Sequence, residues 1–338
     1  MKMSKKNLPV RSASRVVAVS GAATFLGSRL VQTLEADKRY TKIVAIDDQA
    51  PDQIGPTSYF CQIDLTKNEA GTHLHKLFQA NKVDTLVHLA FQSYPTHNSA
   101  RDHELHVIGT MQVLYAAAAA GLRKVVMLGS TMSYGARIEN PHFIKEEHPL
   151  QGGQHDGYIR DLVEAERQLE EFSKEHPEVI TTVLRMANPL GPHIDSFLSR
   201  LLRRGTVPTV LGYDPMLQFL HEDDAVAALK HAIDQDLRGP FNIVAEGALP
   251  LLTVLRLGGQ ASLPLLTPVA KHVSYILWAT RAVDLYPEFI DYLRYPWIGD
   301  GDRARTLLGF SPRYTSRETL LDFIQVTKLN QAPRPKTS

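Results

Sequence analysis

Residues 15–48 constrain the fold of this chain more than any other segment. An apolar run, Val16–Val19, is short enough for a buried strand, and small residues follow it at 20–24. A second apolar run, Ile43–Ile46, ends on Asp47. Between the two runs, a helical pattern places three leucines four residues apart on one face: Leu26, Leu30 and Leu34. The segment therefore predicts a strand, a glycine-containing turn, a helix and a second strand that ends on an acid.

This order of elements is that of a dinucleotide-binding βαβ unit. Gly21 would allow the tight turn, and Gly27 would allow the helix to pack closely on the sheet. The helix N-terminus would offer backbone N–H groups and a positive dipole end to a pyrophosphate. The residues at that end are Thr24, Phe25 and Leu26. The alternative is an ordinary strand-to-helix turn in another α/β fold.

The acid at the end of the second strand bears on the choice of cofactor. Asp47 follows Gly27 by about 20 residues, where a carboxylate accepts hydrogen bonds from the adenosine ribose hydroxyls. No arginine comes directly after it. A carboxylate repels a 2′-phosphate, so the pattern favours NAD over NADP.

Charge and hydropathy exclude several classes of partner. A net charge of +1 leaves no field that would gather nucleic acid or acidic lipid. No stretch approaches the ~18 consecutive apolar residues of a membrane span. The basic N-terminus lacks the apolar core of a signal peptide. We therefore expect a cytoplasmic protein with no nucleic-acid partner and no stable membrane association.

Cysteine and histidine usage predicts no metal centre. The single cysteine, Cys61, excludes an internal disulfide and a cysteine-rich metal site. The chain has 14 histidines, but none forms an H-x-x-x-H pair beside a carboxylate on a convincing helix. No metal is therefore expected.

Strand and helix patterns continue to alternate after the first unit. Strands are predicted at Tyr59–Leu65, Val83–Ala90, Lys124–Ser130 and Val179–Met186, with long helices at Arg101–Ala120 and Tyr158–Phe172. This alternation indicates an α/β protein with a Rossmann-type, doubly wound parallel sheet. Ligands of such sheets lie outside the carboxyl ends of the strands. Candidate site residues at those ends are Asp47, Asp64, Ala90 and Ser130.

The pattern divides the chain into a sheet domain and a smaller C-terminal substrate lobe. We expect a disordered basic leader at 1–14, a Rossmann domain at 15–187 to which 218–245 returns, a lobe made of 188–217 and 246–326, and a tail at 327–338. The apolar, aromatic stretch Val273–Tyr292 could contact an apolar substrate or a membrane surface. Closing the smaller lobe is the commoner explanation.

Eight short motifs follow one another along the chain. They are SGAATFLG at 20–27, IDL at 63–65, VHLAF at 87–91, STMSYG at 130–135, YIRDLVEAE at 158–166, LRMANPLGP at 184–192, QFLHEDDA at 218–225 and LLGFSPRY at 307–314. Their order and spacing resemble those of the extended short-chain dehydrogenase/reductase superfamily, in particular its NAD-dependent epimerase/dehydratase branch. The resemblance covers about residues 15–325.

The resemblance implies how NAD would be held. Asp64 and Leu65 lie in the segment that resembles the family's adenine-contacting one, in which the acid reaches the adenine amino group. Ala90 lies at the strand end that resembles the one touching the cofactor. Tyr158 resembles the tyrosine of the family's YxxxK pair, whose members both reach the nicotinamide ribose.

The same resemblance implies candidates for chemistry. Ser130 matches the position of the catalytic serine, and Tyr158 that of the proton-relaying tyrosine. Asn188 matches a substrate-contacting position. A small-molecule substrate is implied, together with a homodimer formed through the helices at 101–120 and 158–175.

Four positions depart from the family pattern: Thr24, His106, Leu162 and Leu217. Leu162 stands where the family has the lysine that lowers the phenol pKa from about 10 and lets tyrosine act as a base. It continues an apolar helix stripe, which favours packing as its role. Leu217 stands where the epimerases carry an arginine that grips a nucleotide-sugar pyrophosphate, while Thr24 replaces a glycine and His106 an asparagine.

Two functions follow from this comparison. The first is an NAD-dependent oxidoreductase or epimerase that transfers a hydride at a carbinol or ketone of a sugar-like or other small substrate. The second is a non-catalytic NAD-binding protein, structural or redox-sensing, that has lost the lysine. Ser130, Tyr158 and Asn188 favour the first, and Leu162 favours the second.

Overall fold

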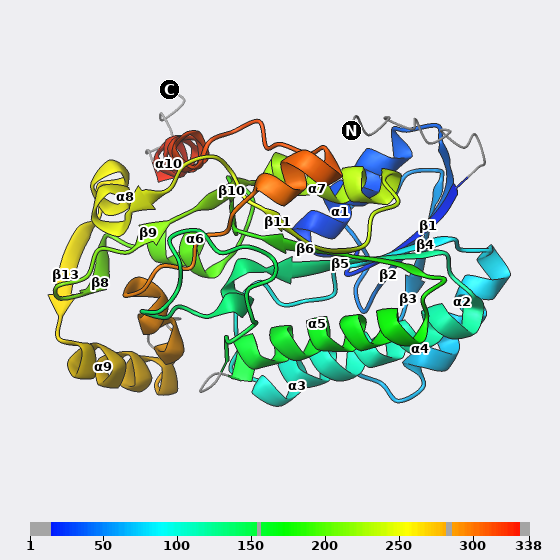
Figure 1. The fold of residues 1–338 in the computed structure, drawn as a ribbon, viewed down its shortest axis with the longest axis horizontal. Coiled ribbons are helices and arrows are strands. Elements are labelled where there is room, and N and C mark those ends of the chain that lie inside the picture. The colour runs from blue at the N-terminus through cyan, green and yellow to red at the C-terminus, as the bar shows by residue number, and fades with distance from the viewer. Residues whose placement is uncertain (1–14, 154–156, 282–285, 332–338) are drawn as a thin grey trace, which may run out of the picture.

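A computed structural model describes residues 15–153, 157–281 and 286–331. Its centre is a parallel sheet of seven strands in the order β11-β6-β5-β4-β1-β2-β3 (Figure 1). These strands are β1 (Arg15–Ser20), β2 (Tyr40–Asp47), β3 (Ser58–Gln62), β4 (Thr85–His88), β5 (Lys124–Ser130), β6 (Ile180–Met186) and β11 (Gly239–Ile243). The order reverses between β1 and β4, as it does in a doubly wound sheet. The predicted fold class is therefore confirmed.

Helices cover both faces of the sheet (Figure 1). One face carries α1 (Phe25–Glu35) and α7 (Glu222–Asp234), and the other carries α2 (Ala70–Asn81), α4 (Gly109–Ala120) and α5 (Gly157–Glu175). The predicted long helix begins earlier than expected, as α3 (Ser99–His103), and passes through a π-helical turn at Glu104–Ile108 into α4. Gly121 ends α4 with a positive φ of 66°, as a left-handed C-terminal residue does.

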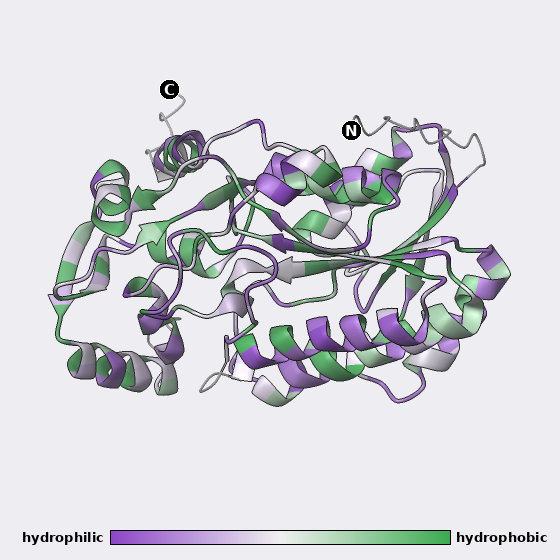
Figure 2. Cartoon of the chain, viewed as in Figure 1, coloured by the Kyte–Doolittle hydropathy of each residue, from purple (hydrophilic) through white to green (hydrophobic). Residues whose placement is uncertain are grey.

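Hydropathy explains this layering. In Figure 2 the strands of the sheet are mainly apolar, whereas α5 alternates between apolar and polar residues along its length. The α5 residues Ala165, Leu169 and Phe172 are buried, because they recur at helical spacing on the face that packs inward.

The remaining elements form the smaller lobe at the left of Figure 1. Its helices are α6 (Phe197–Leu202), α8 (Leu251–Gly258), α9 (Thr267–Ala279) and α10 (Ser316–Gln331), with a 3₁₀ segment at Pro287–Leu293. A π-helical turn at Ala304–Leu308 packs instead against the core of the sheet, beside β11. Three two-stranded pairs accompany them: β7 (Asn188–Leu190) with β10 (Phe219–His221), β9 (Met216–Leu217) with β12 (Leu249–Pro250), and β8 (Thr206–Val210) with β13 (Ala261–Leu265).

Several boundaries differ from those expected. β3 ends at Gln62 rather than at residue 65, because the Asp64 carboxylate accepts hydrogen bonds from the Thr66 backbone and hydroxyl and closes a turn. α10 continues to Gln331, five residues past the expected end of the lobe at 326. The predicted leader at 1–14, and 332–338 of the predicted tail, lie outside the described residues.

β13 was not expected, because 250–326 shows no alternation of strand and helix patterns. Four of its five residues are exposed, and it pairs with β8 alone. An exposed edge strand of this kind carries no period-two burial signal for a sequence pattern to reveal.

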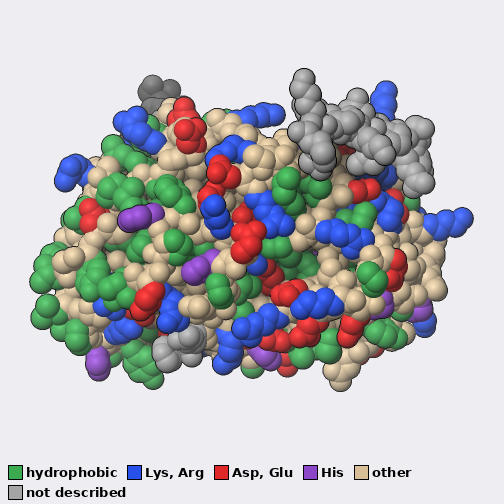
Figure 3. Space-filling model, viewed as in Figure 1, with side chains coloured by type: hydrophobic (Ala, Val, Ile, Leu, Met, Phe, Trp, Pro, Cys, Tyr) green, Lys and Arg blue, Asp and Glu red, His purple; other side chains and the backbone are tan. Residues whose placement is uncertain are grey.

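The apolar stretch around α9 closes the lobe only in part. Phe289, Ile290 and Tyr292 are buried in the lobe core. α9 itself, however, buries only Ala270 and Ser274, and exposes four large apolar residues: Val269, Val273, Tyr275 and Ile276. Figure 3 shows apolar side chains gathered over this end of the molecule. Within the described residues, no helix combines the length and the apolar character needed to traverse a bilayer.

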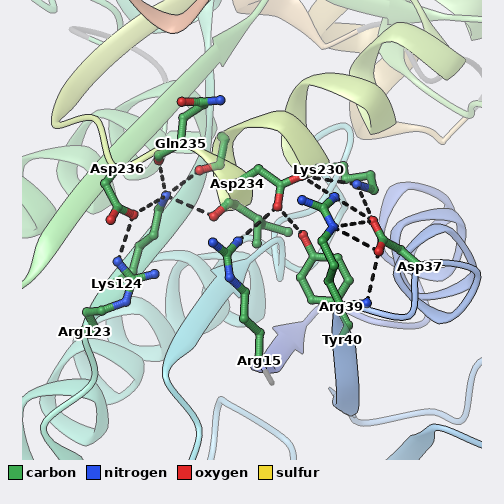
Figure 4. Close-up of polar contacts among 12 residues, drawn as sticks. Arg15, Asp37, Arg39, Tyr40, Arg123, Lys124, Lys230, Asp234, Gln235 and Asp236 are labelled. Carbon is green, nitrogen blue, oxygen red and sulfur yellow. Dashed lines mark hydrogen bonds and ion pairs between the residues drawn. The ribbon is translucent and has the colours of Figure 1, made fainter. Parts of the chain in front are cut away.

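A buried lysine ties the sheet to α7 (Figure 4). Lys124, the first residue of β5, is fully buried, and its Nζ donates to the carbonyl oxygens of Ala232 (2.5 Å), Ile233 (3.3 Å) and Gln235 at the C-terminal end of α7. Burial lowers the pKa of Lys124 to about 8. This cluster lies at the amino end of β5, so it belongs to the scaffold rather than to the edge where a ligand is expected.

Candidate cofactor and active site

The first turn of α1 is built around Thr24. Its Oγ1 donates to the carbonyl oxygen of Gly21 (2.7 Å) and accepts from the backbone N–H of Gly27 (3.1 Å). Thr24 is thus the N-cap of α1, which a hydroxyl residue fills well. The expected middle glycine is therefore replaced by a residue that stabilises the same helix start.

Both remaining glycines are required by close backbone contacts. Gly21 has a φ of +76°, and a Cβ there would lie 2.5 Å from the carbonyl carbon of Leu89. A Cβ on Gly27 would lie 2.0 Å from the carbonyl oxygen of Gly21. The turn, the helix and the end of β4 consequently approach one another more closely than any side chain allows.

Asp47 is pre-oriented at the end of β2. Its Oδ2 accepts from the backbone N–H of Ala23 (2.8 Å), and its Oδ1 accepts from that of Asp48 (2.8 Å). Burial raises the pKa of Asp47 to about 6. Each carboxylate oxygen keeps a further lone pair, so the group can still accept hydrogen bonds from a ribose.

Arg101 joins this acidic group from α3. Its Nη2 lies 2.8 Å from Asp48 Oδ2, and its Nη1 lies 3.8 Å from Asp64 Oδ2. Arg101 is distant from Asp47 in the sequence, so the pattern around Asp47 does not predict it. No local signal would have found it, since Arg101 and Asp48 are 53 positions apart.

The candidate residues line two adjoining cavities. One of them, called the second cavity below, lies beside the ends of β2 and β4. It is lined by Gly21, Thr24, Asp47, Asp64, Leu65, Ala90 and Arg101, among others. The first cavity is lined by Thr24, Phe25, Leu26, Ser130, Tyr158, Leu162 and Asn188, among others. Thr24, Phe91 and Gln92 line both. The expected cofactor residues thus form a single trough, with Gly27 buried beneath it.

The trough suits an extended dinucleotide. The helix end at Thr24 lies between the two cavities, where its positive dipole end would face a pyrophosphate. Asp47 supplies ribose acceptors in one cavity, and Ser130 and Tyr158 lie in the other.

Ser130 and Tyr158 both reach the first cavity but already have partners. Ser130 Oγ accepts from the backbone N–H of Met132 (3.1 Å) and so caps the 3₁₀ turn Thr131–Tyr134. Tyr158 OH donates to the carbonyl oxygen of Gln92 (2.7 Å). The serine keeps its own proton for donation to a substrate oxygen.

Gln92 is a site residue that the sequence analysis missed. Its carbonyl accepts from Tyr158, and its backbone N–H donates to His106 Nε2 (2.9 Å). Burial lowers the pKa of His106 to about 4, so the ring is neutral near pH 7 and can accept this bond. His106 and Tyr158 together therefore hold both backbone polar groups of Gln92, a residue in the wall shared by the two cavities.

Leu162, Asn188 and Leu217 have different surroundings. Leu162 lines the first cavity and packs against the core, so an apolar wall stands where the family's lysine would be. Asn188 lines the same cavity, and its Nδ2 donates to the carbonyl oxygen of Gln218 (3.0 Å). Leu217 is buried, pairs with Leu249, and is absent from the linings of both cavities.

Among the described residues, no three side chains of the histidine, cysteine, aspartate or glutamate type gather as ligands of one ion would.

The raised pKa of Asp47 predicts a pH-dependent affinity for NAD. Because the ionised carboxylate is the better acceptor for ribose hydroxyls, we expect the Kd for NAD to rise as the pH falls through about 6, approaching tenfold per pH unit below it. Titration calorimetry from pH 8 to pH 5 would measure it. Asp47→Asn should bind NAD weakly with no such dependence. A wild-type Kd that stays constant over this range would contradict the role of Asp47.

Comparison with known proteins shows which family this chain belongs to. The model of the NAD-dependent epimerase/dehydratase family matches residues 17–244. An uncharacterized protein of Mycobacterium tuberculosis is 31% identical over 92% of this chain and 84% of its own length. A UDP-glucose 4-epimerase of Erwinia amylovora is 26% identical over 52% of this chain and 54% of its own length.

A solved structure shares the fold over nearly the whole chain. MoeE5 in complex with UDP-glucuronic acid and NAD superposes with a TM-score of 0.72 and 24% identity, covering 93% of this chain and 99% of MoeE5. Members of this family use NAD, which is the cofactor that the trough fits. The chain belongs to the NAD-dependent epimerase/dehydratase family.

Proposed function

We propose that this protein transfers a hydride at a carbinol or ketone carbon of a small, sugar-like or other substrate held in the first cavity. The observation that carries the proposal is that Ser130, Tyr158 and Asn188 line one cavity, which adjoins the cavity of Asp47. NAD, when bound, supplies the hydride acceptor or donor. The family includes an epimerase, so return of the hydride to the other face of a ketone is one form of this reaction.

Ser130 and Tyr158 would act on the same substrate oxygen. Ser130 would donate a hydrogen bond to that oxygen and hold it in place while keeping its own proton, and the N–H of Met132 orients the serine. Tyr158 would move its proton from the Gln92 carbonyl to the substrate oxygen. Asn188 would contact the substrate from β7.

The absence of a lysine at 162 leaves Tyr158 without the cation that would activate its phenol as a base. An ordinary phenol titrates near pH 10, so only about one in a thousand is ionised at pH 7. A neutral phenol can protonate the oxygen of a ketone as it is reduced, but it is a poor base for oxidising an alcohol. We therefore propose that the rate of alcohol oxidation rises as the pH is raised above 7, because the ionised fraction of the phenol grows.

Two observations favour a second candidate, a non-catalytic NAD-binding protein. Leu162 cannot activate the phenol, and Tyr158 OH is already bonded to Gln92. In that case Tyr158 would hold the wall of the cofactor trough and take no part in chemistry.

Nucleotide analysis and turnover separate these candidates. Any nucleotide bound to the purified protein is extracted and identified. The melting temperature of the protein is then measured with added NAD and with added NADP. We expect NAD to be retained or to raise the melting temperature, with Asp47→Ala as the deficient control. If NAD is not retained and does not raise the melting temperature, the cofactor assignment is wrong. NADH consumption or epimer formation with a panel of ketones and sugars then identifies an enzyme, and NAD binding without either identifies the second candidate.

A further inference from the structure

We propose that the first cavity selects an uncharged substrate with an apolar body and rejects nucleoside-diphosphate sugars. This inference rests on the proposed function, because it names the substrate class of the same site. It depends on the charges around the cavity, on the character of its walls and on its few convergent polar groups.

The described lining of the first cavity contains no lysine or arginine. Its only charged member is an acid, Asp195. The two internal segments outside the described residues, 154–156 and 282–285, contain no lysine or arginine in the sequence. A diphosphate brought into this cavity would lose water without gaining a counter-charge, and an unpaired buried anion is strongly disfavoured.

The two cations nearest to this acid are both engaged with it. Arg200 binds Asp195 in a bidentate fashion, with Nε–Oδ1 at 2.9 Å and Nη2–Oδ2 at 2.7 Å. Its guanidinium carbon also lies 3.6 Å from the centre of the Tyr94 ring. Arg203 Nη1 lies 3.7 Å from Asp195 Oδ1, and its guanidinium faces the ring of Phe323. Asp195 therefore neutralises the positive charge that a phosphate would need.

The walls of the cavity are mainly apolar. The apolar residues that line it include Phe25, Leu128, Met132, Leu162, Met186, Ile194, Phe197 and Leu198. An aromatic layer supports this wall, because Phe289 packs edge-on against Phe197 with ring centres 4.2 Å apart and against Tyr158 at 6.2 Å. Such walls stabilise an apolar substrate in proportion to the surface that it buries.

The polar groups that approach the reaction position are few. Ser130 and Tyr158 can each serve one carbinol or ketone oxygen, and Asn188 adds a single amide already bonded to the Gln218 carbonyl. A sugar ring with several hydroxyls would leave most of them facing leucine, methionine and phenylalanine. One oxygen on an otherwise apolar molecule matches this set of partners.

The test measures binding to the NAD-loaded protein, which does not require turnover. The probes are a series of methyl ketones (2-butanone, 2-hexanone and 2-octanone), together with UDP-glucose and UDP. We expect affinity to rise about fourfold per added methylene, the value for transfer of apolar surface out of water. UDP-glucose and UDP should show no binding at millimolar concentration. Affinity that does not rise along the series, or micromolar binding of UDP-glucose, would overturn the inference.

A matched pair of variants tests the role of Asp195. Asp195→Asn should release Arg200 and Arg203 and strengthen UDP binding at least tenfold. Asp236→Asn is the control, because Asp236 is equally exposed and binds Arg123 at 2.8 Å at the amino end of β5. An Asp195→Asn protein that binds UDP no better than the control would contradict the masking of these arginines.

Turnover keeps this inference separate from the proposed function. NADH consumption with ketones of the series would support both. Ketone binding that rises with chain length but gives no turnover would support the apolar cavity and count against hydride transfer. Turnover of UDP-glucose with no binding of the ketones would support hydride transfer and overturn the substrate class.

Discussion

Replacing Tyr158 by phenylalanine is expected to reduce kcat/KM for hydride transfer by 10²–10⁴-fold while leaving NAD affinity within about threefold of wild type. The range is that of a positioned proton donor in the transition state. Phenylalanine preserves the ring that packs against Phe289 and His106 and removes only the hydroxyl that lines the cavity. NADH absorbance measures turnover, and calorimetry measures NAD binding.

Two companion variants sharpen this prediction. Tyr115→Phe on α4, where the side chain is 61% exposed, should change neither quantity. Leu162→Lys should restore a cation one helical turn from Tyr158 and raise alcohol oxidation near neutral pH, because a nearby positive charge favours the phenolate. If Tyr158→Phe turns over as fast as wild type, Tyr158 is not the proton relay. Its hydroxyl would then serve only to hold the Gln92 carbonyl in the cavity wall.

Replacing Arg185 by methionine is expected to lower the free energy of unfolding by about 3–5 kcal/mol, as breaking a buried ion pair does. Arg185 lies on β6, and its Nε donates to Glu166 Oε1 at 2.7 Å. Its Nη1 also donates to the hydroxyl of Tyr134 (2.8 Å) and the carbonyl of Glu146 (2.9 Å). Without the arginine, Glu166 on α5 remains buried with no opposite charge.

Urea unfolding at pH 7 would measure this loss, and two controls assign its cause. Arg185→Met with Glu166→Met should recover part of it, because removing both charges leaves none unpaired. Arg123→Met, which breaks an exposed pair with Asp236, should cost about 0–1 kcal/mol. If Arg185→Met costs less than 1 kcal/mol, the Glu166 carboxylate is readily protonated once the arginine is gone. Burial already raises the pKa of Glu166, which favours that protonated form.

The fold was largely predictable because its signals are local. Buried parallel strands are short apolar runs, and helices that cover them repeat apolar residues every three or four positions. The sequence thus located six of the seven strands of the sheet to within a few residues, and it indicated a return to the sheet within 218–245, where β11 lies. It missed β13 because an exposed edge strand does not need apolar residues. The homodimer expected through α4 and α5 stays a prediction.

The candidate site was predictable only where neighbouring residues form it. Gly21, Thr24 and Gly27 bond or contact one another within one turn, and Asp47 follows at the spacing of a single βαβ unit. Arg101 and Gln92 reach the trough from loops and helices that carry no motif. Arg200 and Asp195 are close in the sequence, but their bidentate pairing depends on side-chain geometry.

The sequence by itself determined the doubly wound sheet, the position of the cofactor edge and the residues at the strand ends, since these follow from apolar periodicity and from glycines at a tight turn. Only the tertiary structure decided what surrounds Tyr158: the Gln92 carbonyl that holds its hydroxyl, the apolar wall that includes Leu162, and the acid that masks Arg200. The physical reason is that charge and solvation in a cavity are set by side chains distant in sequence, which folding alone brings within a few ångströms of each other.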